Sequence, residues 1–334
     1  MSKQIIFAIV LLITIGAFAY TMRRVFAFFS LTRPFPVKNW GKRINKMLVV
    51  AFGQTKILRK PVVGLMHALV WWGFIVILFG SIEMIIDGLA GTERILAVIG
   101  PVYDIIIASG DIFAWIIAIV IIAFLVRRVF MHIRRFKGIE MKHVSHWDAN
   151  IALTLILLLM ITLQGMNTFY ILQSEAAGHE IKGIYPVSHF VAGFYGQMEL
   201  STIHFWHEFN WWGHIVLIFI FANILPYSKH FHVFTSVPNV LLSRLEPLGY
   251  LPNMPNITKE VKMMMDPDQA FGEPAADEEE TVERFGVLDV EDITWKNYLD
   301  SLACTECGRC TEACPANITG KKLSPRKILM DVRA

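Results

Sequence analysis

Five long apolar blocks constrain the fold of this chain more than any other feature. They cover roughly residues 4–22, 62–87, 109–129, 149–171 and 207–227. A helix needs about 20 apolar residues to cross the hydrocarbon core of a bilayer, and each block is close to that length. The hydrophobic fraction of 54% over 334 residues is above that of soluble domains. The sequence therefore predicts an all-α membrane protein with five transmembrane helices.

The apolar blocks end well before the C-terminus, and this predicts three parts. Residues 1–235 carry the five blocks and are expected to form the membrane bundle. Residues 236–292 contain several prolines and the acidic run 277–280, which is typical of a solvated linker. Residues 293–334 contain every cysteine and are expected to form a small α-helical domain, entered through a helix that follows Thr294.

The connections between the blocks differ in charge. Those after the first and third blocks are rich in Lys and Arg, whereas the other two have little beyond Arg94 and Lys182. The positive-inside rule assigns basic connections to the cytoplasmic side. We therefore predict a multi-pass protein of the inner (cytoplasmic) membrane, with its N-terminus outside and its C-terminal domain in the cytoplasm.

The first basic connection contains a helical pattern. Its apolar positions are Trp40, Ile44, Met47, Leu48 and Ala51, with lysine and arginine on the opposite side. Such a pattern favours a short helix in the headgroup region of the bilayer. A solvated loop is the alternative.

A run of four cysteines close to the C-terminus carries the clearest chemistry. Cys304, Cys307, Cys310 and Cys314 are followed by Pro315, and this spacing matches the run of bacterial [4Fe–4S] ferredoxins. Zinc and disulfides are the alternatives. Zinc ligands usually divide into two pairs, and cytoplasmic thiols resist oxidation. We predict an iron–sulfur cluster, with a tight backbone curl at a glycine, Gly308.

The fourth cysteine of the run raises a question of cluster number. In two-cluster ferredoxins the first three thiolates of such a run bind one cube and the fourth binds the other. The chain has only these four cysteines, so a second cluster lacks three of its ligands. We expect one partial site here, and two clusters only where further sulfur ligands are supplied.

Histidines in the apolar blocks indicate a second cofactor. His67 lies in the second block, His214 in the fifth, and His230 and His232 at the end of the fifth. On a continuous helix the eighteen steps from His214 to His232 make five whole turns, so the two would share one face about 27 Å apart. Imidazole is an axial ligand of haem iron. The pattern favours two stacked b haems, with His67 opposite His232. His230 is rotated away from that face towards the headgroups and is a further candidate haem ligand.

The outer haem of such a pair has no evident second ligand. The remaining histidines of the outer half are His179 and His189 in a connection, and His204 and His207, which precede the same helix as His214. A single haem between His67 and His214 is the alternative. His132, His143 and His146 lie beside basic residues, where we expect solvated or lipid-contacting side chains.

The histidines and the stretch Leu225-Pro226-Tyr227-Ser228-Lys229-His230-Phe231-His232 resemble the gamma subunit, a dihaem cytochrome b, of respiratory nitrate reductase. This resemblance implies that His67 and His232 bind the inner haem and that His214 is one ligand of the outer haem. That family has a second histidine ten residues after the first, where this chain has Ile77.

Fusion of such a cytochrome to a ferredoxin module resembles membrane Fe–S oxidoreductases related to heterodisulfide reductase. Members usually carry a second ferredoxin run downstream, so we expect the sequence to be part of a longer protein. The resemblance implies electron transfer between menaquinone and a soluble partner, either an electron-transferring flavoprotein or a protein with Cys-rich (CCG) domains. Near the outer helix ends, Glu83, Asp87, Asp111 and Glu208 are candidates for proton exchange with quinone, and we favour Glu83.

The sequence leaves two other functions open. In the first alternative the bundle is a non-catalytic anchor for a redox partner. In the second the cluster is a redox sensor. In each case the partners are a lipid bilayer and a protein, and we expect no nucleic acid. The direction of electron flow and the catalytic residues do not follow from these residues.

Overall fold

Five long helices dominate the computed structural model. They are α1 (Ser2–Phe29), α3 (Pro61–Ala90), α4 (Pro101–Phe130), α5 (His143–Ala177) and α7 (Leu200–Ile224). The structure describes residues 2–131, 133, 138, 140–141, 143–247, 249–251, 253–266 and 286–333. Each of the five helices is long and apolar enough to cross a membrane. The prediction of an all-α membrane protein with five spanning helices is confirmed.

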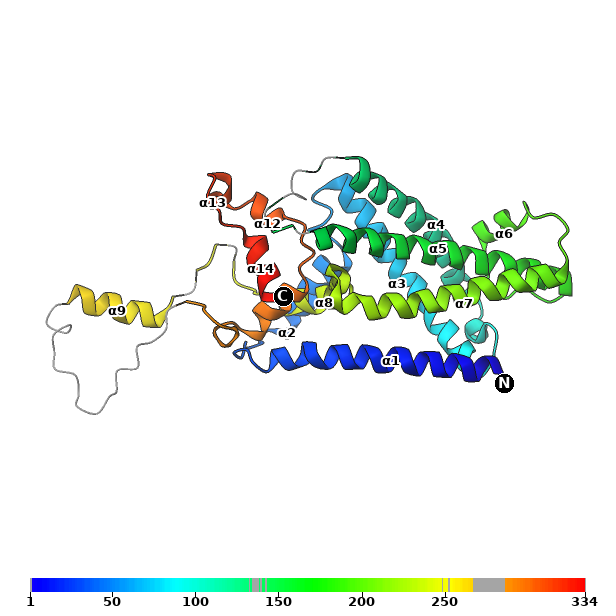
Figure 1. The fold of residues 1–334 in the computed structure, drawn as a ribbon, viewed down its shortest axis with the longest axis horizontal. Coiled ribbons are helices and arrows are strands. Elements are labelled where there is room, and N and C mark those ends of the chain that lie inside the picture. Colours follow the sequence, from blue (N-terminus) through cyan, green and yellow to red (C-terminus); the bar gives the residue numbers. More distant parts are fainter. Residues whose placement is uncertain are drawn as a thin grey trace.

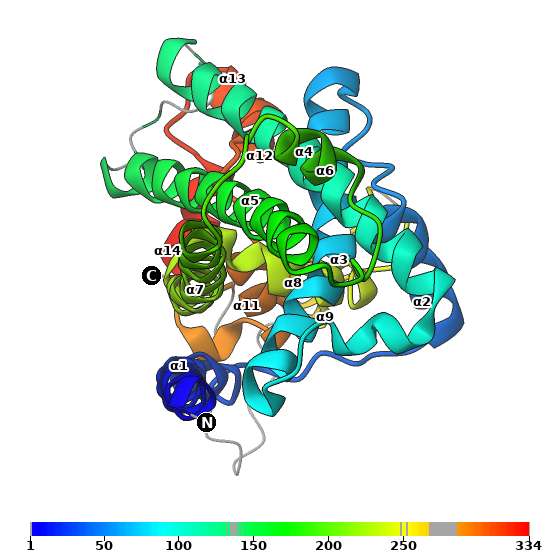
Figure 2. The same cartoon turned by 90° about the vertical axis from the view of Figure 1, so that its right-hand side faces the viewer.

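The five helices form a ring. Close packing joins α1 to α3, α3 to α4, α4 to α5, α5 to α7 and α7 back to α1, and the view along the bundle shows this order (Figure 2). The helices α3 and α7 are not among the closely packed pairs. The two helices that carry His67 and His214 are therefore not direct neighbours in the ring.

The two ends of the bundle are different. One end carries the N-terminus and the short helix α6 (Pro186–Ala192), and the other carries the cysteine-containing domain (Figure 1). We call these the outer end and the inner end. Proline stands at the first position of α3, α4 and α6, where its missing N–H costs no hydrogen bond.

The fifth apolar block does not continue as one helix to His232. The helix α7 ends at Ile224, two 3-10 turns cover Leu225–Tyr227 and Lys229–Phe231, and α8 (His232–Leu241) begins anew. Pro226 explains the break, because proline lacks an N–H group and its ring clashes with the preceding turn of an α-helix. The prediction that His214 and His232 share a face of one helix is therefore wrong, although both remain inside the protein.

The predicted helix in the first basic connection is present. It comprises α2 (Trp40–Met47) and a π-helical turn, Leu48–Phe52. Arg43 on α2 donates to the carbonyls of Lys38 and Ser243 at 2.6 and 2.7 Å. The helix is thereby tied to the end of α8, and its position in the headgroup region stays a prediction.

The C-terminal part consists of short helices. They are α11 (Trp295–Leu302), α12 (Arg309–Glu312), α13 (Pro315–Ile318) and α14 (Pro325–Arg333), preceded by a 3-10 turn at Val290–Asp292. The helix predicted to lead to Cys304 is confirmed as α11, which begins with a capping box between Thr294 and Asn297. In the linker, α9 covers Pro255–Met265, and the acidic run 277–280 lies outside the described residues.

Candidate electron-transfer site

The inner end of the bundle brings His67 of α3 and His232 of α8 together. Their ring centroids are 6.4 Å apart, and the ring planes are inclined by 32°. A metal–imidazole nitrogen bond is about 2.0–2.1 Å long and a ring centre lies about 1.1 Å behind the nitrogen, so two imidazoles on opposite sides of one metal have centroids roughly 6.3 Å apart. The observed separation fits two axial ligands of one haem iron.

The orientation of the His232 ring also suits a metal ligand. Its Nδ1 lies 3.0 Å from the carbonyl oxygen of Lys229. A ligating histidine usually donates its other ring N–H to such an oxygen, which fixes the tautomer and leaves the second nitrogen for the metal. The Nδ1 atom of His67 is buried and has no hydrogen-bond partner among the described residues.

His230 lies beside this pair. Its ring centroid is 5.9 Å from that of His232, and its Nδ1 is 3.1 Å from the hydroxyl of Ser228. Burial and, to a smaller extent, the neighbouring His232 lower the pKa of His230 to about 4. A neutral ring held by Ser228 suits a packing role next to the His67–His232 pair.

His214 lies deeper in the bundle and is only 2% exposed. Its Nδ1 is 3.0 Å from the carbonyl oxygen of Leu159 and 3.1 Å from the hydroxyl of Thr162. The structure does not bring His67 and His214 together as it does His67 and His232. The predicted inner pair is thus assembled, while His214 lies at a separate position.

The other outer histidines do not reach His214. His179 and His204 are exposed. His189 is an exposed residue 3.6 Å from Glu175. His207 is buried next to Tyr170, with 6.4 Å between ring centroids. Of the inner-side histidines, His146 makes a backbone contact with Arg128, and His132 and the side chain of His143 lie outside the described residues.

The acidic residues near the outer end have structural partners. Glu83 accepts hydrogen bonds from the Tyr103 hydroxyl and the Leu96 N–H, each at 3.0 Å. Asp111 accepts from the backbone N–H groups of Val187 and Ser188 at 2.7 and 2.9 Å. Asp87 binds the Thr92 hydroxyl at 2.5 Å, and Glu208 pairs with Lys3 at 2.6 Å.

The cysteine loop has the curled backbone that a cluster requires. Gly308 has φ of 75°, as its predicted role demands, and Glu306 has φ of 55° although it is not glycine. Cys304 interacts electrostatically with Cys307 and Cys310, so the first three thiols of the run lie near one another. Among the described residues no three His, Cys, Asp or Glu side chains are placed to hold one metal ion, whereas a four-iron cube takes its thiolates on separate corners.

The Cys307 thiol lies beside the guanidinium of Arg309. Burial raises its pKa, but the N–H of Arg309 and the guanidinium of the same residue outweigh burial and lower the pKa below its ordinary value. The Nε of Arg309 donates to the Cys307 sulfur at 3.2 Å. Burial raises the pKa of Cys304. The thiolate is the metal-binding form of cysteine, so a lowered pKa is compatible with Cys307 as a cluster ligand.

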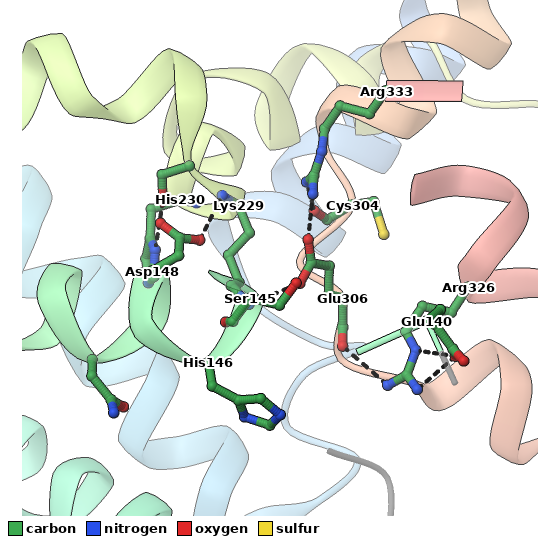
Figure 3. A network of polar contacts seen from close by, with 12 residues as sticks. Glu140, Ser145, His146, Asp148, Lys229, His230, Cys304, Glu306, Arg326 and Arg333 are labelled. Atoms are coloured by element: carbon green, nitrogen blue, oxygen red, sulfur yellow. Dashed lines mark hydrogen bonds and ion pairs between the residues drawn. The ribbon is translucent and has the colours of Figure 1, made fainter. Parts of the chain in front are cut away.

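A buried ion-pair network joins the cysteine loop to the histidine turn (Figure 3). Lys229 donates to Glu306 at 2.8 Å and to the carbonyl of Ser145 at 2.5 Å. The side chains of Lys229 and Glu306 are only 9% and 4% exposed. Arg333 binds the other oxygen of Glu306. Lys229 therefore contacts the cysteine loop through its side chain and orients His232 through its carbonyl.

A second buried ion pair holds the same domain to the α4–α5 connection. Arg326 of α14 lies 2.6 Å from Glu140, and both residues are almost completely buried. Burial raises the pKa of Glu140, but its hydrogen bonds with its own backbone, Ser324 and Arg326, together with the Arg326 charge, lower it overall. Sequence reasoning missed these pairs, because Glu140 and Arg326 are 186 residues apart.

Apolar contacts complete the docking of the domain. A buried cluster joins Leu225 and Phe231 of the bundle to Tyr298 and Leu302 of α11. The backbone of Arg33 forms an isolated parallel bridge with Thr294. Through Lys229, which binds Glu306 with its side chain and His232 with its carbonyl, the cysteine loop is linked to the histidine pair.

Comparison with known proteins supports the 4Fe-4S segment. Residues 295–316 match the model of a 4Fe-4S binding domain. The chain is 27% identical over 297 residues to the "EtfAB:quinone oxidoreductase" of Syntrophomonas wolfei, covering 87% of this chain and 37% of that protein. It is 28% identical over 336 residues to the "Probable iron-sulfur-binding oxidoreductase FadF" of Bacillus subtilis, covering 99% of this chain and 43% of that protein.

A shorter match concerns the membrane-anchored ferredoxins. Over 64 residues the chain is 38% identical to the "Probable membrane-anchored ferredoxin" of Chromohalobacter salexigens, covering 19% of this chain and 10% of that protein. No solved structure matches. The chain spans less than half the length of the first two relatives. Two of these relatives are named as oxidoreductases, one of them iron-sulfur-binding, and the third is named as a membrane-anchored ferredoxin.

Proposed function

We propose that this chain is the membrane part of an oxidoreductase that conducts electrons between an iron–sulfur centre and a b haem. The link through Lys229 between the cysteine loop and the histidine pair supports the proposal. When bound, the cluster and the haem each exchange one electron at a time. Cys304, Cys307 and Cys310 would hold the cluster, with Cys314 completing this or a neighbouring one, and His67 and His232 would hold the haem.

The protein side chains between these ligands have defined tasks in this proposal. The Lys229 carbonyl orients His232, and the Lys229–Glu306 ion pair holds the cysteine loop in place. Arg309 donates to the Cys307 sulfur. These contacts keep the two cofactors at a fixed separation, which the rate of electron transfer requires.

The membrane carrier in this proposal is a quinone, with menaquinone as the favoured species. The name of the Syntrophomonas wolfei relative includes a quinone and EtfAB. We extend that to this chain, with an electron-transferring flavoprotein or a CCG-domain protein as soluble partner. The basic connections support a cytoplasmic position for the inner end.

The test is a redox titration of the purified protein in detergent. A menaquinol analogue should reduce a b-type haem, and reduced flavoprotein should do so from the other side. In His67→Ala both reductions of the inner haem should be lost. A protein without b-type absorbance, or one whose haem neither donor reduces, would instead support a non-catalytic anchor.

A further inference from the structure

The helix α2 and the π-helical turn that follows it leave one apolar face uncovered. Trp40, Ile44, Leu48 and Phe52 recur at intervals of four residues, and all four are exposed. Residues three or four apart on a helix lie on the same face, so these side chains form one stripe, which we call the α2 stripe. The helix lies at the inner end of the bundle, packed against α8 (Figure 1).

The far end of the α2 stripe lies against a membrane-spanning helix. The indole nitrogen of Trp72 on α3 donates to the Phe52 carbonyl oxygen at 2.8 Å, and the Phe52 ring centroid is 6.2 Å from that of Trp71. The helix α3 begins at Pro61, so Trp72 lies about 16 Å along its axis at about 1.5 Å per residue. This end of the stripe is therefore level with a part of α3 well inside its length, where acyl chains can cover it.

Positive charge accompanies the α2 stripe. Between Arg23 and Lys60 the chain contains ten lysine and arginine residues and no aspartate or glutamate. Several of these cations are exposed and form no ion pair within the residues that the structure describes, namely Lys38, Lys42, Lys56, Arg59 and Lys60. A basic segment beside an uncovered apolar face is typical of a surface that binds anionic lipids.

Two further cations of α2 are bound by backbone carbonyl oxygens instead of carboxylates. Buried Arg43 donates to the carbonyl of Ser243 at 2.7 Å, and Lys46 donates to that of Arg244. These contacts supply hydrogen-bond acceptors and attach α2 to the end of α8. They add no negative charge, so the positive charge of both side chains remains.

The cations around Lys46 repel one another. Burial, Lys56 and Arg43 lower the pKa of Lys46, and Lys296 adds a smaller lowering effect. Glu246 is the one nearby acid that raises this pKa, and its effect is smaller than that of Arg43. An anion placed beside these side chains would relieve the repulsion, because opposite charges attract strongly where water is partly excluded.

We propose that the α2 stripe and its lysines bind anionic phospholipids of the leaflet at the inner end. The acyl chains cover the stripe, and the phosphate headgroups lie beside Lys42 and Lys56. A soluble phosphate would leave the stripe uncovered. A second copy of this chain on the same stripe would bring its own ten cations against these ten, and like charges oppose such a contact. The inference goes beyond the proposed electron transfer and does not depend on it.

The experiment is native mass spectrometry of the purified full chain in a neutral detergent. Phosphatidylglycerol and phosphatidylcholine with the same acyl chains are added separately, and the affinity for each is measured. We expect phosphatidylglycerol to bind more than 30-fold more tightly. The double variant Lys42→Gln/Lys56→Gln should lose about 30-fold of this preference, which corresponds to about 2 kcal/mol for two basic residues near an anionic surface.

Two control variants separate charge from apolar contact. Lys321→Gln/Lys322→Gln removes the same charge from two exposed positions of the iron–sulfur domain and should leave the preference unchanged. Ile44→Ser/Leu48→Ser shortens the apolar side chains of the stripe. It should weaken the binding of both lipids and leave the ratio of their affinities unchanged.

Four results would overturn the inference. Equal affinity for the two lipids would exclude recognition of the charge, and equal losses in the two lysine double variants would exclude Lys42 and Lys56. Displacement of the lipid by glycerol 1-phosphate, at the concentration at which phosphatidylglycerol binds, would identify a site for soluble phosphate. A dimer that Ile44→Ser/Leu48→Ser dissociates would identify a second copy of the chain as the occupant.

Discussion

Replacing Lys229 with methionine tests whether the buried ion pair holds the iron–sulfur domain against the bundle. The substitution removes the ammonium group, which contacts Glu306 and the Ser145 carbonyl, at similar side-chain volume. It leaves the Lys229 backbone carbonyl, which orients His232, in place. We therefore expect unchanged haem content and a weaker attachment of the domain.

The magnitude follows from the burial of the pair. Removing one partner of a buried ion pair costs about 3–5 kcal/mol, because the other charge is left without compensation. Glu306 keeps its contact with Arg333, so we expect the lower end, about 3 kcal/mol. Since about 1.4 kcal/mol changes an equilibrium constant tenfold, the docking equilibrium should shift roughly 100-fold towards the detached domain.

Two measurements detect this shift. Amide hydrogen exchange in α11 and α14 should become faster, and reduction of the haem through the cluster should become slower. The control is Lys327→Met, which breaks the exposed pair of Lys327 with Asp331 on α14, because exposed pairs contribute only about 0–1 kcal/mol. Equal exchange and equal reduction rates in the two variants would refute the assigned role of Lys229.

Three further predictions concern the ligands, the pH dependence and the orientation. His67→Ala should lower the haem content by about one per chain and abolish the low-spin signal, whereas His230→Ala should keep the haem and its low-spin signal. Pyridine haemochrome assays measure the haem content, and electron paramagnetic resonance measures the spin state. The pKa of Glu140 is lower in the folded protein than in the unfolded chain. Its pair with Arg326 therefore stabilises docking above the unfolded pKa of about 4.3, and this contribution is lost as the pH falls through the folded pKa. Pepsin cleavage of α11–α14 should rise as the pH falls through that window, and it should rise less steeply in Glu140→Gln. A reporter fused after Ala334 should be active only if it is one that works in the cytoplasm. Activity of a reporter that works only in the periplasm would contradict the predicted orientation.

The sequence was most informative where local chemistry determines structure. Apolar length predicted all five spanning helices, and the cysteine spacing predicted the loop around Gly308. The pairing of His67 with His232 also followed, since each lies at the inner end of its block. Four of the helices extend beyond both ends of the predicted blocks, whereas α7 begins earlier than the fifth block and ends three residues before it, at Ile224.

The sequence was least informative about contacts between distant segments. Lys229 and Glu306 are 77 residues apart, and neither belongs to a recognisable motif. Glu306 stands inside the cysteine run, where any residue type is compatible with the spacing. Only the fold shows that its carboxylate is buried and that a lysine next to the histidines neutralises it. The break at Pro226 was also missed, since the apolar pattern continues across it.

The short helix α8 links the two cofactor sites mechanically. His232 stands at its first position, and Thr235, one turn later, donates to the Leu302 carbonyl of α11 at 3.4 Å. Near its other end Asn239 accepts from Lys296 of α11 at 2.6 Å. The helix α11 leads directly to Cys304. A shift of the cysteine loop relative to the bundle would therefore also displace the ring of His232, so docking of the iron–sulfur domain and ligation of the inner haem are expected to be coupled. A substitution that removes the Lys296–Asn239 bond should accordingly broaden the low-spin haem signal. A substitution that removes the Lys3–Glu208 pair, which lies far from α8, should not.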